Sequence, residues 1–198
     1  MENQSLFREL IESLINQTNG NDGLFVLSEN GKIISFSSNT ELIKDFAPFC
    51  INSKSVLSKL QAYLEKNAMT EAHFDKSYRL IAEIESFVSD IASDVPFDVY
   101  ESKVSIGGVI KSLGVEIVED YTNPLEKIFD YMEAIRFLSG DKLFVFVGMR
   151  SYFDDEHMLD FFRTIVSHDY KAFFIEPIQR KSLYDEMYCI IDSDLCEI

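Results

Sequence analysis

The sequence predicts an α/β protein, in which a head domain built on a parallel sheet carries a hairpin of two long helices. Three patterns lead to this fold class. A continuous apolar run at residues 142–147 is typical of a strand that is covered on both faces in a parallel sheet. Helical patterns alternate with this run and with a second apolar run at 173–175, as in βαβ units. Residues 53–94, in contrast, suit a helix at almost every position.

The domain organisation follows from the same patterns. A chain of 198 residues fits one domain, or one domain that contains a substantial helical insertion. We therefore expect a head formed by residues 1–50 and 104–198, and a helical domain formed by residues 51–103.

The first half of the chain has three clear signals. Leucine, isoleucine and phenylalanine recur at helical spacing over residues 5–17, with Ser5 placed to cap that helix. Asn30-Gly31 tolerates a positive φ and separates the apolar segments 24–27 and 32–36, which predicts a β-hairpin. The long helical stretch at 53–94 has a break near 67–70, and Pro96 ends it.

The second half is expected to alternate helices and strands. Asn123 and Pro124 place a cap and a first-turn proline at the start of one helix, and Gly140 closes that helix. The other expected elements are a helix at 104–113 stopped by Gly114, a strand at 115–118, the strand at 142–147, a helix at 154–167, the strand at 173–175 and a last strand at 188–191.

The charge balance limits the classes of partner. The chain has 34 acidic and 18 basic residues, a net charge of −16. The negative electrostatic field of the whole protein repels nucleic acid and favours basic partners or divalent cations. Three widely spaced cysteines without a CxxC pair indicate a reducing compartment. No apolar run has the roughly 20 residues of a membrane helix, and no signal peptide is recognisable, so we expect a cytoplasmic protein without a membrane partner.

The sequence gives no positive support for an enzyme. Gly107-Gly108 and Lys111-Ser112 superficially suggest a phosphate loop, but Ile110 occupies the position directly before the lysine where that loop needs glycine. No serine or cysteine lies in a recognisable nucleophile frame, and we assign no catalytic residue.

Two sets of charged residues are candidate binding groups. Lysines on the expected helices could contact phosphates, although surface lysines are usually only solvated; they are Lys54, Lys59, Lys103 and Lys111. Acids near the junction of the helices and the head could gather into a cation site, or could form a solvated acidic face; they are Asp94, Asp98, Glu101, Glu119 and Asp120.

Several segments also carry a family resemblance. The segments are residues 52–60, 110–115, 125–129, 143–147 and 188–194, together with Phe174-Ile175-Glu176-Pro177. In these segments the chain resembles the short-form, ring-forming DNA-binding adaptation proteins of type II-A CRISPR systems, the Csn-type family. The resemblance covers nearly the whole chain and is most specific beyond Val104.

The resemblance implies a fold and a function. The implied fold is a nucleotidase-like α/β head without a phosphate loop, with a helical leg. The implied function is non-enzymatic: four copies close into a homotetrameric ring that threads double-stranded DNA ends during spacer acquisition, beside the CRISPR integrase proteins and the effector nuclease. Lysines focused on an inner channel can coexist with an acidic outer surface. We expect Lys54, Lys59, Lys103 and Lys111 to contact DNA.

The resemblance also implies bound calcium that orders the leg and the ring, with Asp98 and Glu101 as ligands. The sequence departs from the family in two places. It starts essentially at the first helix, where the family has an extra strand and turn, and Lys103 and Gly108 stand where the family has acids. The alternative functions are an acidic protein-interaction module that never touches DNA and a degenerate nucleotide-binding enzyme.

Overall fold

The computed structural model describes residues 3–100, 102–184, 186–192 and 194. The chain divides into two compact units, a head formed by Met1–Phe49 with Tyr121–Ile198 and a helical unit formed by Cys50–Asp120. The structure therefore groups residues 104–120, which we expected in the head, with the helices. The mixed α/β fold class is confirmed.

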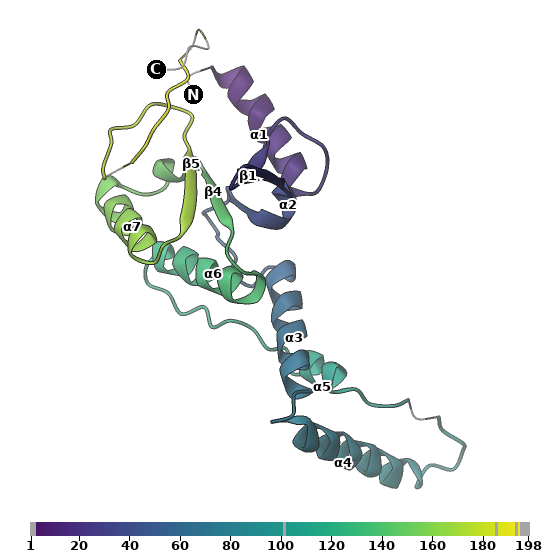
Figure 1. Ribbon diagram of the computed structural model, residues 1–198. Helices are drawn as coiled ribbons and strands as arrows, with labels where there is room; N and C mark the ends of the chain where they lie inside the picture. The colour runs from purple at the N-terminus through teal and green to yellow at the C-terminus, as the bar shows by residue number, and fades with distance from the viewer. Residues whose placement is uncertain (1–2, 101, 185, 193, 195–198) are drawn as a thin grey trace. The chain divides into compact units, whose positions relative to one another are not determined.

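A three-stranded parallel sheet lies at the centre of the head (Figure 1). Its strands are β3 (Thr40–Ile43), β4 (Leu143–Val147) and β5 (Lys171–Ile175), in the order β3-β4-β5. Strand β4 is the central one and its middle residues are buried, as its apolar run predicts. The connection from β3 to β4 contains the whole helical unit, so the unit is an insertion in one crossover of the sheet.

Two long helices of the head begin and end where the sequence signals lie. Helix α6 (Pro124–Ser139) has Asn123 as its N-cap, and Gly140 ends it with a φ of 81°. Helix α7 (Asp155–Ser167) follows the short 3-10 turn η1 (Met149–Ser151), and the Asp154 side chain accepts a hydrogen bond from the His157 amide. These two expectations are confirmed.

Aromatic side chains fill the core between the sheet and α7. Phe146 stacks on Phe174 with ring centroids 4.9 Å apart, and the edge of Phe161 packs against Phe146 at 5.7 Å. Phe162 makes a T-shaped contact with Phe174, also at 4.9 Å. Offset and edge-on geometries of this kind stabilise aromatic cores beyond the burial of their area.

The N-terminal part of the head differs in detail from expectation. Helix α1 spans Gln4–Thr18, but its cap is Asn3, which accepts a hydrogen bond from the Leu6 amide, so the expected cap at Ser5 was wrong. The hairpin is confirmed as β1 (Leu27–Glu29) and β2 (Lys32–Ile34), with positive φ at Asn30 and Gly31. Helix α2 (Phe36–Asn39) begins at the last residue of the expected hairpin, and strand β3 follows; the sequence predicted no element for residues 37–43.

The helical unit contains α3 (Lys54–Ala68), α4 (Phe74–Ala92) and α5 (Ile106–Ser112). Helices α3 and α4 have the expected break between them, but among the residues described here they do not pack side by side as a hairpin. Helix α5 packs along α3 instead, and α4 turns away after the connection at 69–73 (Figure 1). A hydrogen bond of 2.8 Å from the Ser77 hydroxyl to the Ala68 carbonyl connects α4 to the end of α3.

Two expected strands are absent from the described residues. Residues 115–118 have no regular secondary structure, and the Asn52 side chain is hydrogen-bonded to the backbone of this segment. Its amide nitrogen donates to the Ile117 carbonyl at 2.8 Å, and its oxygen accepts from the Ile117 amide at 2.9 Å. Residues 188–190 have no regular structure, and Ile191 makes an isolated β-bridge. No helix in the described part of the chain is both long and apolar enough to cross a membrane.

Candidate nucleic-acid interface

Helix α3 is a locally basic element of an acidic chain. It carries Lys54, Lys59 and Lys66 and a single acid, Glu65. Each of the other described helices of at least thirteen residues, α1, α4, α6 and α7, contains more acids than bases. Positive charge is therefore concentrated on α3, where a phosphate backbone would meet little repulsion from the same helix.

Helix α5 adds one lysine and no acid to this region. The Ser105 side chain caps it by accepting from the Gly108 amide at 3.0 Å, and Lys111 lies exposed in its last turn. Gly107 allows the close approach of the two helices, since a Cβ there would lie 2.5 Å from the carboxyl carbon of Glu65. We call the four lysines of this packed pair, Lys54, Lys59, Lys66 and Lys111, the basic helix pair.

The lysines of α3 do not all share one face. Lys54 and Lys59 are five residues apart and therefore about 140° apart around the helix. Lys66 follows Lys59 by seven residues, which places the two within about 20° of each other and about 10 Å apart along the axis. Sequence reasoning missed Lys66, although its spacing from Lys59 within an already expected helix was the signal that could have found it.

Lys103 lies outside the basic helix pair. It is exposed in the irregular segment that precedes α5. The next residue is tied to α4, because the Val104 amide donates to the Glu85 carboxylate at 3.1 Å. The structure thus brings Lys54, Lys59 and Lys111 onto one helix pair and leaves Lys103 beside an acidic helix.

The expected calcium ligands do not form a site among the described residues. Asp98 is exposed in the irregular segment between α4 and α5, and Glu101 lies outside the residues that the structure describes. The described residues contain no group of three or more His, Cys, Asp or Glu side chains that could hold a metal ion. Calcium takes six to eight oxygen ligands, and a calcium site that includes Asp98 and Glu101 stays a prediction.

The two glycines that superficially suggest a phosphate loop lie within a helix. Gly107 and Gly108 lie inside α5, in the helical unit, where the described residues form no strand. A phosphate loop instead joins a strand to the helix that follows it.

The carboxyl ends of the head strands, where open α/β sheets bind ligands, are tied together by a buried arginine. The Arg150 guanidinium donates to the Lys181 carbonyl at 2.8 Å and to the Asp155 carboxylate at 3.1 Å. The Arg150 amide donates to the Glu176 carboxylate at 3.0 Å. Burial is the main cause that raises the pKa of the Glu176 carboxyl. These contacts link the segment after β4 to the segment after β5.

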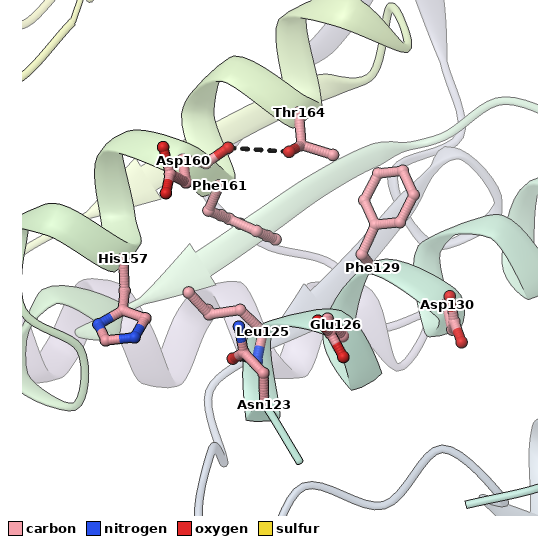
Figure 2. Close-up of a pocket in the computed structure, with 9 residues that line it drawn as sticks. All are labelled: Asn123, Leu125, Glu126, Phe129, Asp130, His157, Asp160, Phe161 and Thr164. Carbon is pink, nitrogen blue, oxygen red and sulfur yellow. Dashed lines mark hydrogen bonds between the residues drawn. The ribbon is translucent and has the colours of Figure 1, made fainter. Parts of the chain in front are cut away.

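A pocket in the head lies between α6 and α7 and has a volume of about 290 Å³ (Figure 2). Its lining residues are Asn123, Leu125, Glu126, Phe129, Asp130, His157, Asp160, Phe161 and Thr164. Its carboxylates repel phosphate. Asp130 accepts from the Tyr121 hydroxyl at 2.8 Å, and Asp160 pairs with Arg163 at 3.1 Å. The pocket is therefore unsuited to nucleic acid.

Two sequence comparisons indicate one family, and a comparison with solved structures indicates a similar fold. A family profile described as "CRISPR-associated protein (Cas_Csn2)" matches residues 17–195. A curated relative from Streptococcus agalactiae, the CRISPR-associated protein Csn2, is 26% identical over 155 residues, which are 77% of this chain and 68% of the relative. The crystal structure of Stu0660 of Streptococcus thermophilus is similar in fold, with a TM-score of 0.57 and 14% identity. That match covers 89% of this chain and 61% of Stu0660, so this chain spans less than two thirds of that structure.

Proposed function

The chain belongs to the Csn2 family of CRISPR-associated proteins, and on that premise we propose that it binds ends of double-stranded DNA without catalysing a reaction. Four copies form a ring around the duplex, and the complex acts in the acquisition of new spacers. Its partners are the CRISPR integrase proteins and the effector nuclease, and it works in the cytoplasm.

The observation that carries this proposal is the basic helix pair. A chain with a net charge of −16 needs a confined basic surface in order to approach a polyanion. Helices α3 and α5 together have four lysines and one acid. Lysine contacts to phosphate position a protein without reading bases, so we expect binding without sequence preference.

Two features support a function without catalysis. The glycines near Lys111 lie within a helix, so they do not form a phosphate loop after a strand. The contacts of Arg150 with Lys181 and Glu176 tie down the chain at the carboxyl ends of the strands, where α/β sheets bind their ligands.

The ring is tested by the topology of the DNA. A closed ring can be threaded only at a free end, so linear duplex should bind and covalently closed circles of the same sequence should not. A gel-shift titration with both substrates, repeated at several salt concentrations, measures this difference. Sedimentation at micromolar protein should show four copies. Equal affinity for circles and linear DNA contradicts threading, and a species of one copy contradicts the ring.

The alternative is an acidic protein-interaction module that does not bind DNA. The head favours it, since it carries twenty-two acids and eleven bases. The salt dependence of DNA affinity distinguishes the two functions. Only neutralisation of phosphates by lysine makes the affinity for duplex DNA fall steeply as the salt concentration rises. Absence of any shift of linear duplex at low salt favours the alternative.

Calcium binding rests on the family resemblance alone. A ligand bound only by the native state raises the melting temperature. A higher melting temperature in millimolar calcium than in chelator supports a site that includes Asp98. An unchanged melting temperature removes calcium from the proposal.

A further inference from the structure

The pocket between α6 and α7 carries negative charge that its own lining does not neutralise. Three of its lining residues are acids, Glu126, Asp130 and Asp160, and none of the residues that line it is lysine or arginine. Both helices belong to the head, so a single compact unit forms the pocket. The proposed binding of DNA does not use it. A concave site with this charge is complementary to a positively charged ligand.

Two of the three carboxylates form a repulsive pair. Glu126 and Asp130 lie one turn apart on α6, and like charges at this spacing destabilise a helix. The helix dipole favours Glu126 in the first turn, but Asp130 lies beyond that turn. The Asp130 carboxylate accepts from the neutral Tyr121 hydroxyl at 2.8 Å, which leaves its charge in place. Within the part of the chain that the structure describes, the Glu126 carboxylate makes no ion pair or hydrogen bond. The pair therefore favours a cation from outside the chain.

The third carboxylate shows that a guanidinium fits the rim of the pocket. Asp160 on α7 pairs with Arg163 at 3.1 Å, and 72% of the Asp160 side chain and 56% of the Arg163 side chain are exposed. An exposed ion pair of this kind contributes little free energy, so an incoming cation can replace it. Arg163 does not line the pocket, so its guanidinium leaves the pocket open.

The apolar part of the pocket is aromatic (Figure 2). Leu125 and Phe161 are buried, and Phe129 on α6 is half-buried. Aromatic faces attract cations, and a guanidinium stacks on such a face while its planar fork pairs with carboxylates. The ammonium group of lysine has no such plane. Aromatic rings beside carboxylates therefore fit arginine better than lysine.

The pocket suits a side chain held by a protein better than a free small molecule. Its volume of about 290 Å³ is at the lower end for small-ligand sites, which enclose most of the ligand surface. Glu126, His157 and Asp160 are exposed, so a ligand there stays partly in contact with solvent. A basic protein segment adds contacts outside the pocket, and the head attracts it because it has twice as many acids as bases.

We propose that this pocket receives an arginine side chain from a basic segment of a partner protein. The guanidinium pairs with Glu126 and Asp130 and stacks against Phe129. This inference goes beyond the proposed function, because it requires neither DNA nor the assembly of several copies.

Binding of short peptides tests the chemistry of the ligand. The probe is a fluorescent peptide with one arginine between two lysines, and its control carries the uncharged analogue citrulline in place of arginine. Fluorescence anisotropy should show at least about tenfold tighter binding of the arginine peptide, because only the guanidinium neutralises the carboxylates. Equal affinities overturn the proposal. Binding of acetyl-arginine amide as tightly as the peptide also overturns it, since the pocket would then take a free small molecule.

A charge-neutralising variant tests the location. Glu126→Gln with Asp130→Asn removes both charges and keeps the shape of the side chains, and the asparagine still accepts from the Tyr121 hydroxyl. We expect at least about tenfold weaker binding of the arginine peptide. The matched control, Glu9→Gln with Glu12→Gln, makes the same change of net charge on exposed residues of α1 and should stay within about twofold of the unmodified protein. A similar loss in the control would show that the charge of the whole head attracts the peptide, and would overturn the assignment to the pocket.

The aromatic contribution is tested by Phe129→Leu. Loss of the ring should weaken binding of the arginine peptide by about two- to fivefold and leave the citrulline peptide unaffected. An equal change for both peptides would show that Phe129 acts only through its packing on Tyr170 and His168, and would overturn the stacking. Circular dichroism of each variant checks that the fold is intact. Linear-duplex affinity should not fall in these variants, so failure of the peptide site and failure of DNA binding are distinguished.

Discussion

The head and the helical unit bury their apolar residues very differently. Of the nineteen buried hydrophobic residues that the structure describes, seventeen belong to the head and only Ile51 and Val56 to the helical unit. Of the twenty-six large hydrophobic residues that are exposed in the described part of the chain, fifteen belong to the helical unit, although that unit is the smaller of the two. The head therefore has a hydrophobic core of its own, whereas the helical unit leaves most of its large apolar side chains exposed.

This difference separates two roles within one chain. Hydrophobic burial is the main term that stabilises a fold, so the head can be stable in a single copy. The helical unit has few such contacts and must draw stability from whatever covers it. The basic helix pair also lies in that unit, which is therefore where we expect DNA to contact the protein.

The largest expected effect is a difference in unfolding free energy between alanine variants of two phenylalanines. Phe146 is fully buried and stacks on Phe174, so Phe146→Ala should cost about 3–5 kcal/mol of unfolding free energy. Phe87 is 65% exposed on α4, so Phe87→Ala should cost less than about 0.5 kcal/mol in a single copy. Chemical denaturation of dilute protein measures both. Similar losses of unfolding free energy in the two variants would contradict the stated difference between the head and the helical unit.

A smaller effect is expected where polar contacts hold the helical unit. Asn52→Ala removes both hydrogen bonds to the Ile117 backbone and one to Glu119, and should cost about 1–2 kcal/mol. Asn67→Ala is the matched control, since its exposed amide only donates to the Tyr63 carbonyl one turn before it. Hydrogen exchange should quicken at residues 114–120 in the first variant alone. Unchanged exchange there would show that Asn52 does not hold this segment.

The smallest effect concerns pH and the head. Because burial raises the pKa of the Glu176 carboxyl above its ordinary value of 4.5, the native state holds this proton more tightly than the unfolded state does. Its contribution to stability is complete at low pH and is lost as pH rises through the folded pKa. Relative to the unmodified protein, Glu176→Gln should therefore gain stability as pH rises from 4.5 to neutrality. A difference in melting temperature that stays constant with pH would contradict this sign.

The head was the more predictable region, for a physical reason. Local signals determine its elements: Asn123, Pro124 and Gly140 bound α6, and the apolar run of β4 reports burial on both faces. Strand β3 escaped prediction because it has only four residues. It is positioned by contacts far along the chain, including pairing with β4 and a hydrogen bond from the Tyr131 hydroxyl to Glu41. The sequence of one short segment does not show which distant residues it will contact.

The helices of the helical unit were predicted from the sequence, but the strand expected at 115–118 and the packing of the helices were not predicted correctly. Helix propensity predicted the helices and the break before α4. The packing of α5 on α3 could not be predicted in this way, because it depends on the close approach of Gly107 to Glu65, two residues that are far apart in the sequence. For the candidate interface, residue type identified Lys54, Lys59 and Lys111. The helical geometry added Lys66 and separated Lys103 from the others.

The central claim is that DNA binds through local positive charge on α3 in spite of the acidic chain. It is tested most directly by the salt dependence of linear-duplex affinity in Lys59→Glu with Lys66→Glu. The control is Lys32→Glu with Lys181→Glu, which makes the same change of net charge on exposed residues of the head. The account predicts weaker binding and a salt slope lower by about one unit for each lost phosphate contact in the α3 variant, with little change in the control. Equal losses in both variants, or an unchanged slope in the α3 variant, would contradict it.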